Sequence, residues 1–189
     1  GIGNVVFITA GIHGSELSSQ VAVLKLISYL ENNPIKGTVH IIPFIQPKAT
    51  ASNVRNYNNV NLNSKANVPG TISNNVVELI CSLRCDTYGD FHCTQPNGDP
   101  GKDVAMGSYS PLSESAKIAD FISKKTGYSK LIYDIAGKEY GGAMEDTVNL
   151  RGIPSVTCEV LTPHGTIAAG SVDKSFNMMK ALLQYNNLI

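Results

Sequence analysis

The sequence carries no excess of charge of either sign. Its 189 residues include 15 Lys and Arg and 15 Asp and Glu, which gives a formal net charge of +0 at pH 7. A nucleic-acid-binding surface or a polybasic membrane patch would need clustered positive charge, so we expect neither. No apolar run approaches the roughly 20 residues of a membrane-spanning helix, and we expect no membrane span.

Cysteines are few, and none of them forms a C-x-x-C pair. Two of the four have the i, i+4 spacing that can bring side chains together on a helix, but two core residues share that spacing. We expect all four to be buried small apolar residues rather than ligands or disulfide partners. They are Cys81, Cys85, Cys93 and Cys158.

The length fits one domain, residues 1–189, with a substantial buried core. The chain starts at Gly1 rather than Met, directly before an apolar run. We therefore expect a mature product or a domain cut from a longer protein. A missing signal peptide says nothing about location in that case.

Apolar periodicity indicates strands that alternate with helices, which predicts an α/β domain with a mostly parallel, mixed central sheet flanked by helices. Strands are expected over residues 5–10, 38–44, 86–94, 131–135 and 155–161. Helices are expected over residues 15–30, 76–83, 114–126, 143–150 and 171–188. Residues 46–69 and 95–111 show no period and are expected to form long loops. In such sheets the functional site lies outside the carboxyl ends of the strands.

The segment Val5–Glu16 carries the first candidate ligands. A continuous apolar run rich in β-branched residues predicts a strand buried on both faces. Two glycines then mark a turn that contains His13 and Glu16, in the spacing H-x-x-E. An imidazole nitrogen and a carboxylate oxygen are both ordinary zinc ligands, so this pair can hold one cation. The alternative is a plain turn with Glu16 in a first helical turn, where the helix dipole favours an acid.

Two later residues complete a catalytic constellation. His92, near the end of the strand over residues 86–94, can supply a third ligand and leave a fourth position open for water, as catalytic zinc sites do. Glu159 is a lone carboxylate in an apolar strand, where an unpaired acid is costly. We interpret it as the general base that takes a proton from zinc-bound water and passes it to the leaving amine.

Taken in order, these residues resemble the zinc carboxypeptidase family, including its succinylglutamate desuccinylase and aspartoacylase relatives. The similarity covers about residues 5 to 161. Gly11 to Glu16 matches the H-x-x-E motif, and Gln46-Pro47 matches the start of a loop that begins Asn-Pro in the family. Arg55 matches the family's arginine, and Asn59 to Asn63 resembles its G-V-D-L-N segment. Asp90-Phe91-His92 resembles D-x-H, and Gly152 to Pro154 with Thr157 to Glu159 resembles the strand of the catalytic glutamate.

The resemblance implies one Zn²⁺ per chain, bound by His13, Glu16 and His92. It also implies that Arg55 polarises the scissile carbonyl and stabilises the oxyanion, with Glu159 as the base. The alternative for Arg55 is a solvated loop arginine. Asp90 is expected to orient another group rather than to bind the metal.

Substrate-binding residues follow the family pattern less closely. Asn63 matches a substrate-binding asparagine, although it can also merely cap a turn. The peptidases have an arginine next, which binds the substrate's terminal carboxylate. Here the position holds Ser64, followed by Lys65 as a possible point charge. Tyr140 is the nearest match to the family's mobile tyrosine, and an ordinary loop tyrosine is the alternative.

Two further histidines are expected to lie outside the ligand set. His40 falls inside a predicted strand and is expected to be a packed strand residue. His164, in the segment Thr162-Pro163-His164-Gly165, is expected to be a loop residue near the site rather than a ligand.

The sequence therefore predicts a zinc-dependent hydrolase of the carboxypeptidase type, which cleaves an amide bond by attack of zinc-activated water. The first hypothesis is a peptidase, with branched or cross-linked cell-wall peptides suited to the altered Ser64 position. The alternatives are an N-acyl amino acid deacylase with the same chemistry and an inactive binding module. The expected partner is a peptide or N-acyl amino acid substrate. A cell-wall substrate would favour an extracellular or cell-surface location, and other substrates a cytoplasmic one.

Overall fold

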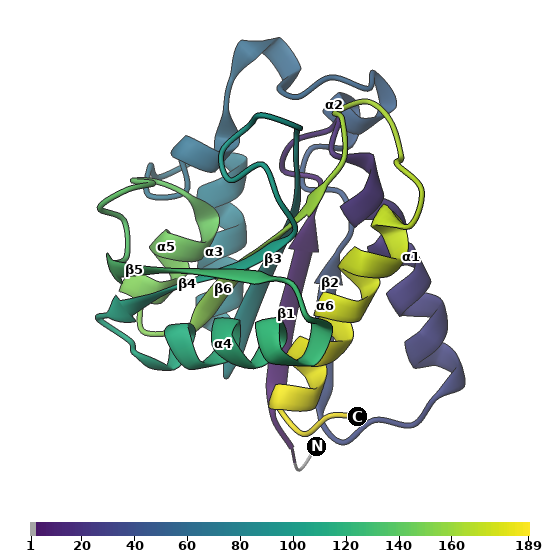
Figure 1. The fold of residues 1–189 in the computed structure, drawn as a ribbon. Helices are drawn as coiled ribbons and strands as arrows, with labels where there is room; N and C mark the ends of the chain where they lie inside the picture. Colours follow the sequence, from purple (N-terminus) through teal and green to yellow (C-terminus); the bar gives the residue numbers. More distant parts are fainter. Residues whose placement is uncertain (1–2) are drawn as a thin grey trace.

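Six strands form one mixed sheet in a computed structural model that describes residues 3–189, with the strand order β2-β1-β3-β6-β4-β5 (Figure 1). The strands are β1 (Val5–Ala10), β2 (Thr38–Ile42), β3 (Thr87–Thr94), β4 (Val104–Ser110), β5 (Ser129–Ile135) and β6 (Ser155–Leu161). The helices are α1 (Leu17–Asn32), α2 (Pro47–Ala51), α3 (Ile72–Ser82), α4 (Glu114–Thr126), α5 (Met144–Leu150) and α6 (Ser171–Tyr185).

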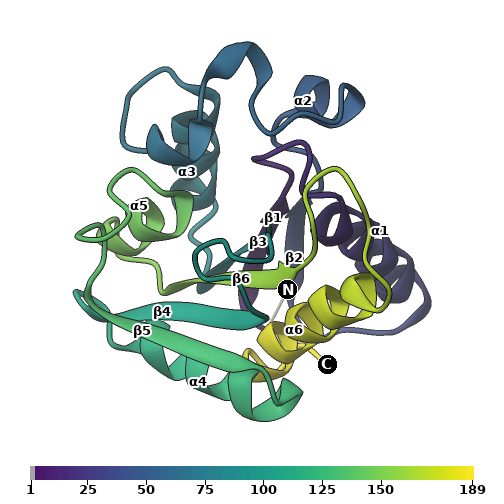
Figure 2. The ribbon, with the colours of Figure 1, turned by 45° about the horizontal axis from the view of Figure 1, so that its top comes forward.

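Helices cover both faces of the sheet, as Figure 2 shows. Helices α1, α4 and α6 pack on one face, where Val6 and Ile8 of β1 join the larger apolar cluster. Helices α3 and α5 pack on the other face, together with Phe7 and Tyr88. Successive β1 residues therefore enter opposite cores, which explains why the strand is apolar at every position. The predicted fold class is confirmed.

The parallel part of the sheet places the candidate site. Strands β2, β1, β3 and β6 run in the same direction, so their carboxyl ends meet at one edge. The turn with His13 and Glu16 follows β1 at this edge. In the pairing of β3 with β6, His92 lies directly opposite Glu159, so both side chains emerge on the same face of the sheet.

One strand was missed by the sequence analysis. Residues 95–111 are not a loop throughout, because β4 spans Val104–Ser110 and runs antiparallel to β6. Its short side chains hid the strand pattern, and the packing explains them. A Cβ atom on Gly107 would lie 2.6 Å from the backbone oxygen of Ser115 in α4, so α4 can sit this close only to a glycine.

Local capping chemistry explains two smaller differences. Helix α3 begins at Ile72 rather than at residue 76, because the Thr71 hydroxyl accepts a hydrogen bond from the backbone N–H of Asn74 at 3.1 Å. Within residues 46–69, which were expected to be loop, the chain forms α2 and two single 3₁₀ turns, Tyr57–Asn59 and Leu62–Ser64. Pro47 at the start of α2 lacks an N–H that a first turn would leave unpaired.

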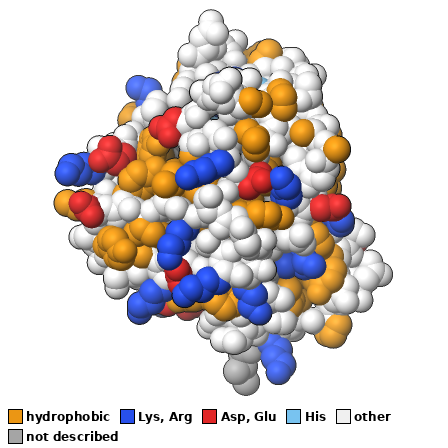
Figure 3. Space-filling view, viewed as in Figure 1, with side chains coloured by type: hydrophobic (Ala, Val, Ile, Leu, Met, Phe, Trp, Pro, Cys, Tyr) orange, Lys and Arg blue, Asp and Glu red, His pale blue; other side chains and the backbone are white. Residues whose placement is uncertain are grey.

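The surface and the cysteines agree with the composition. Basic, acidic and apolar side chains are interspersed on the face drawn in Figure 3. Among the described residues, no helix combines the length and the apolar character needed to cross a membrane. All four cysteines are free thiols, and Cys85, Cys93 and Cys158 are buried as expected. Cys81 is only partly buried, so the expectation is wrong for that residue. His40 stacks on Phe7 within the sheet, with ring centroids 5.9 Å apart, as expected for a packed strand residue.

Candidate metal centre and active site

The turn after β1 is shaped by a close backbone contact. A Cβ atom on Gly14 would lie 2.1 Å from the carbonyl carbon of Ala49 in α2, so only glycine fits at the position directly after His13. The Gly14 N–H donates to the Arg55 carbonyl at 3.1 Å. These contacts bring the Arg55 loop and the H-x-x-E turn together, and Glu16 takes the position just before α1.

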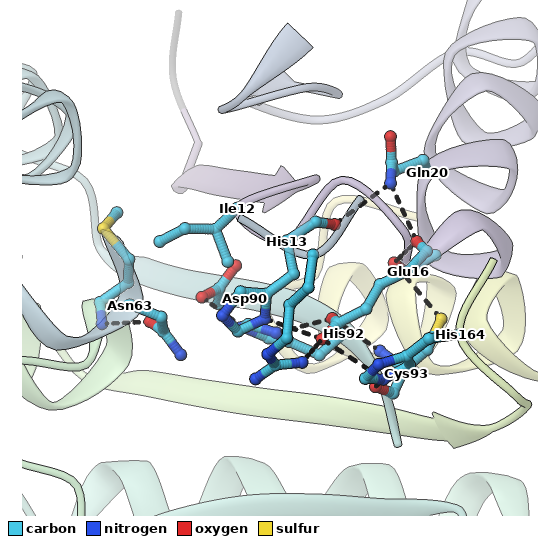
Figure 4. A network of polar contacts seen from close by, with 12 residues as sticks. Ile12, His13, Glu16, Gln20, Asn63, Asp90, His92, Cys93 and His164 are labelled. Atoms are coloured by element: carbon cyan, nitrogen blue, oxygen red, sulfur yellow. Dashed lines mark hydrogen bonds and ion pairs between the residues drawn. The ribbon is translucent and has the colours of Figure 1, made fainter. Parts of the chain in front are cut away.

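The three predicted ligands meet in the structure. His13 Nδ1 lies 2.7 Å from Glu16 Oε1, and His92 Nδ1 lies 2.9 Å from Glu16 Oε2 (Figure 4). Each residue offers one ligand atom, and the three atoms lie within 4.8 Å of one another. All three side chains are buried. They form the one group of at least three neighbouring His, Cys, Asp or Glu ligands found in residues 3–189.

The outer nitrogens of both imidazoles fix how the rings are protonated. His13 Nε2 lies 3.0 Å from Asn61 Oδ1, an oxygen already identified as an acceptor by the Asn63 N–H at 3.1 Å. His92 Nε2 lies 2.8 Å from Asp90 Oδ2. Since these partners only accept, each Nε2 carries the proton, and in a neutral ring each Nδ1 lone pair faces Glu16.

Such an arrangement of two imidazole lone pairs and a carboxylate fits a cation. Burial would lower the pKa of His92, but Asp90 and Glu16 outweigh burial and raise it well above its ordinary value. A metal ion would replace the proton that the metal-free site holds between these groups. Two nitrogens and one carboxylate oxygen are the ligand set of many catalytic zinc sites, so the residues present fit the metal that the sequence predicted.

Glu16 is the centre of the polar network in Figure 4. Besides the two histidines, Arg55 Nη1 donates to Oε1 at 2.8 Å, and the Cys93 backbone N–H donates to Oε2 at 3.0 Å. Burial acts to raise the pKa of Glu16, but His13 and His92 hold it well below its usual range. Glu16 is therefore ionised at neutral pH and can balance a bound cation.

Glu159 lies beside this network, and its Oε2 atom finds no hydrogen-bond partner in the described part of the chain. It lines the same cavity as the three ligands, and its Oε2 atom is buried and unpaired. Burial raises the pKa of Glu159 to about 8, and His92 opposes part of that rise. A carboxyl group with a pKa near neutrality can both accept and return a proton, which is the property that a general base needs.

The cavity has a volume of ≈ 490 Å³ and collects most of the predicted substrate-binding residues. Asn63, Ser64 and Tyr140 line it, as does Arg55. Asn63 Oδ1 accepts a hydrogen bond from the Met144 N–H at 3.0 Å, and Tyr140 donates its hydroxyl to Asp99 Oδ2 at 2.9 Å. Lys65 is exposed and does not line the cavity. The structure thus places Ser64, but not Lys65, at the wall.

Sequence analysis gave no role to three residues of the site, Asn61, Glu145 and Asp146, whereas it did place His164 nearby. Asn61, which holds His13, belongs to the N-V-N-L-N segment, but the sequence gave no sign that its oxygen would meet an imidazole. His164 lies on the cavity wall, where Nε2 donates to the Cys93 carbonyl at 2.9 Å and stays 3.7 Å from Glu16 Oε1. It is a neighbour of the ligand set, as the sequence analysis expected. Glu145 and Asp146 also line the cavity.

A mixed sheet of this order, with a His-Glu-His cluster at the carboxyl ends of its strands, defines an α/β fold of the carboxypeptidase type. Residues 2–185 match the model of the succinylglutamate desuccinylase/aspartoacylase catalytic domain, and the chain belongs to that family of hydrolytic enzymes. The predicted resemblance is confirmed. Comparison with curated protein sequences gives no significant match.

Solved structures share the fold at low sequence identity. A succinylglutamate desuccinylase/aspartoacylase from Rhodobacter sphaeroides has 18% identity and a TM-score of 0.78, with 100% of this chain and 57% of that chain covered. A metallo-carboxypeptidase from Burkholderia cenocepacia has 17% identity and a TM-score of 0.74, with 97% and 57% covered. The mDAP-bound form of Csd4, a D,L-carboxypeptidase from Helicobacter pylori, has 13% identity and a TM-score of 0.74, with 99% and 52% covered. The chain thus spans little more than half the length of these proteins.

Proposed function

We propose that this chain is the catalytic part of a zinc-dependent hydrolase that cleaves an amide bond, most simply in a peptide. The observation that carries the proposal is the orientation of the three candidate ligands. Both Nδ1 atoms face one carboxylate, and both Nε2 atoms are held by oxygen acceptors. This is the arrangement that supporting residues impose on metal-binding histidines. When bound, a zinc ion supplies Lewis-acid activation of water and of a carbonyl oxygen.

The chain's own residues supply the remaining chemistry. Glu159 carries an unpaired buried oxygen. The charge of a bound cation would favour its ionised form, which can take a proton from the attacking water and return it to the leaving amine. Arg55 lies on the cavity wall, 2.8 Å from Glu16, and its guanidinium stabilises negative charge that develops on the carbonyl oxygen. His13, Glu16 and His92 are the residues that would hold the metal.

The cavity charge favours a peptide over a polyanionic substrate. Arg55 is the single Lys or Arg side chain that lines the cavity among residues 3–189, and it is already paired with Glu16. A substrate with several carboxylates would find no other strong cation there. A second candidate, an N-acyl amino acid deacylase, is supported by the family match over residues 2–185. Both candidates use the same hydrolytic residues, so the identity of the substrate separates them.

The base is tested by Glu159→Gln, which keeps the size of the side chain and removes the proton acceptor. We expect kcat to fall by about a hundred- to ten-thousand-fold, with zinc content unchanged by elemental analysis. Glu139→Gln is the matched control, because Glu139 lines the same cavity but is exposed. Near-normal turnover in Glu159→Gln would exclude Glu159 as the base.

The substrate class is tested by mass spectrometry of products from linear peptides, isopeptides that mimic branched cell-wall peptides, and N-acyl amino acids. Cleavage of the peptides or isopeptides supports the first candidate, and cleavage restricted to N-acyl amino acids supports the second. A zinc-loaded protein that cleaves none of the three classes would contradict both candidates and favour a binding module.

A further inference from the structure

The cavity wall is strongly acidic. Six carboxyl side chains line it, against the single guanidinium of Arg55. They are Glu16, Asp99, Glu139, Glu145, Asp146 and Glu159. Glu16 belongs to the candidate metal site, and Glu159 is the proposed base. Asp99 accepts a hydrogen bond from the Tyr140 hydroxyl. Glu145 and Asp146 have no role in the proposed hydrolysis, although their charge is unusual for buried residues.

Glu145 and Asp146 are buried without a cationic partner. Their exposed fractions are 7% and 6%. Neither forms an ion pair within residues 3–189, and Glu145 Oε1 has no hydrogen-bond partner at all. An isolated buried carboxylate is costly, so a structure that retains one usually provides a counterpart. The partners of the pair are each other and the backbone N–H of Gly137, which bonds to Asp146. Neither partner carries a positive charge, so a cationic ligand in the cavity could supply the counterpart.

Without such a counterpart, both carboxyl groups have pKa values shifted toward the protonated form. Burial raises the pKa of Glu145 well above its ordinary value, and the neighbouring Asp146 adds to the rise. Burial also raises the pKa of Asp146. Two adjacent acids in a poorly solvated site share a proton because both cannot ionise at once. A bound cation would remove that restriction and allow both to ionise.

The position of the pair places it on the substrate path. Both residues lie at the start of α5, and the Met144 N–H immediately before them donates to Asn63 Oδ1 at 3.0 Å. The pair is therefore next to the wall formed by Asn63 and Ser64, in the same cavity as Glu16 and Glu159. A metal ion is a poorer occupant than an ammonium group, because no third ligand joins the two acids among residues 3–189.

We propose that Glu145 and Asp146 bind a protonated amine of the substrate, so that the amide cleaved belongs to a molecule with a free ammonium group away from the scissile bond. The proposal rests on the proposed function and names the substrate class: a cationic peptide or amide, such as one with a lysine-like side chain. An ammonium group donates three hydrogen bonds, which suits two carboxyl groups with free acceptor sites. The charge-assisted bonds would fix which part of the substrate enters this end of the cavity.

The test uses matched peptides that carry lysine or norleucine, which differ by the terminal ammonium group alone. Each residue is placed first on the leaving side and then on the acyl side of the scissile bond. We expect the zinc-loaded protein to prefer lysine on one side by about tenfold or more in kcat/KM. In Glu145→Gln and in Asp146→Asn this preference falls toward one, while hydrolysis of the norleucine peptide is kept. Glu139→Gln retains the preference, because an exposed carboxylate binds ammonium weakly.

Binding of free lysine and norleucine, measured by calorimetry on the zinc-loaded protein, separates this proposal from the hydrolytic one. Tighter binding of lysine that is lost in Glu145→Gln supports the ammonium site even if no amide in the panel is cleaved. Equal binding of the two amino acids, or a lysine preference that survives both Glu145→Gln and Asp146→Asn, would overturn the proposal. Circular dichroism and zinc content confirm that each variant is folded before it is compared.

Discussion

Asp90 Oδ2 lies 2.8 Å from His92 Nε2, on the side of the imidazole ring away from Glu16. The other Asp90 oxygen accepts a hydrogen bond from the Thr9 hydroxyl at 2.7 Å, and Thr9 in turn lies 2.6 Å from the Tyr88 hydroxyl. A buried chain of polar groups thus holds the His92 ring from behind. Because Asp90 Oδ2 is a hydrogen-bond acceptor, His92 Nε2 carries the proton, and Nδ1 is left to bind the proposed metal.

Removing the charge behind His92 should weaken metal binding without removing a ligand. For Asp90→Asn we expect about a 10- to 100-fold loss of zinc affinity, measured by competition with a chelator. Asp86→Asn is the control, because within residues 3–189 the exposed Asp86 side chain accepts a hydrogen bond from the Val5 N–H alone. Unchanged affinity in Asp90→Asn would mean that the Asp90–His92 contact has no influence on the metal.

Removing a proposed ligand should have a larger effect. In His92→Ala the cluster keeps His13 and Glu16 only, and two ligands hold zinc poorly. We expect elemental analysis after dialysis to find less than one zinc per chain, whereas the parent protein retains about one. One tightly bound zinc in the variant would show that the metal is held elsewhere.

Glu159 gives the metal-free protein a pH-dependent stability with a definite sign. Its pKa is raised from an ordinary value of 4.5 to about 8, so between these values the folded chain keeps a proton that the unfolded chain releases. Because of this group, the free energy of unfolding falls as the pH rises from 4.5 to about 8. It is highest and constant below pH 4.5, and lowest and constant above pH 8.

Glu159→Gln removes the titrating carboxyl group and therefore tests this pH dependence. We expect the variant, relative to the parent, to gain stability on the order of a few kcal/mol between pH 5 and pH 8.5. Urea unfolding of both metal-free proteins at the two pH values measures the gain. A difference between the two proteins that does not change with pH would show that Glu159 is ionised in the fold.

Ser64 should leave the substrate's free carboxylate without a strong partner. The zinc carboxypeptidases that the sequence resembles have an arginine at the position of Ser64, and a guanidinium pairs with a carboxylate in a bidentate manner. Lys65, the next residue, does not line the cavity. We expect peptides with free and amidated C-termini to differ by less than about tenfold in kcat/KM, and Ser64→Arg to shift the ratio toward the free carboxylate. A strong preference for free ends in the parent protein would point to Arg55 or another cation as the substitute.

Much of the fold was predictable because it depends on local patterns. The apolar run of β1 and the helical period of α4 follow directly from burial on one or two faces, and α4 was predicted with its observed bounds, Glu114–Thr126. Strand β4 was not predictable, because a glycine in its middle interrupts the apolar pattern and the reason for that glycine lies in the tertiary packing. Gly107 is explained only by the backbone of α4 beside it.

The candidate site divides in the same way. His13, Glu16 and His92 have side chains whose chemistry is specific enough to suggest a metal before their positions are known. Asn61 is one of many asparagines in its loop, and only the folded chain shows that its oxygen meets His13. Glu145 and Asp146 have the pattern of acids in a first helical turn exposed to water. Their burial arises from the packing of α5 at the cavity.

The strand order also determines when the site can form during synthesis. Strand β6 is the last strand in the chain, yet it lies between β3 and β4. A nascent chain that has emerged from the ribosome only as far as β5 holds two separate pieces of sheet, β2-β1-β3 and β4-β5, each with an unpaired edge. His13, Glu16 and His92 all belong to the first piece, whereas Glu159 arrives with β6. The three candidate ligands can therefore assemble before the proposed base, and the complete candidate site exists only once the final strand has joined the two pieces.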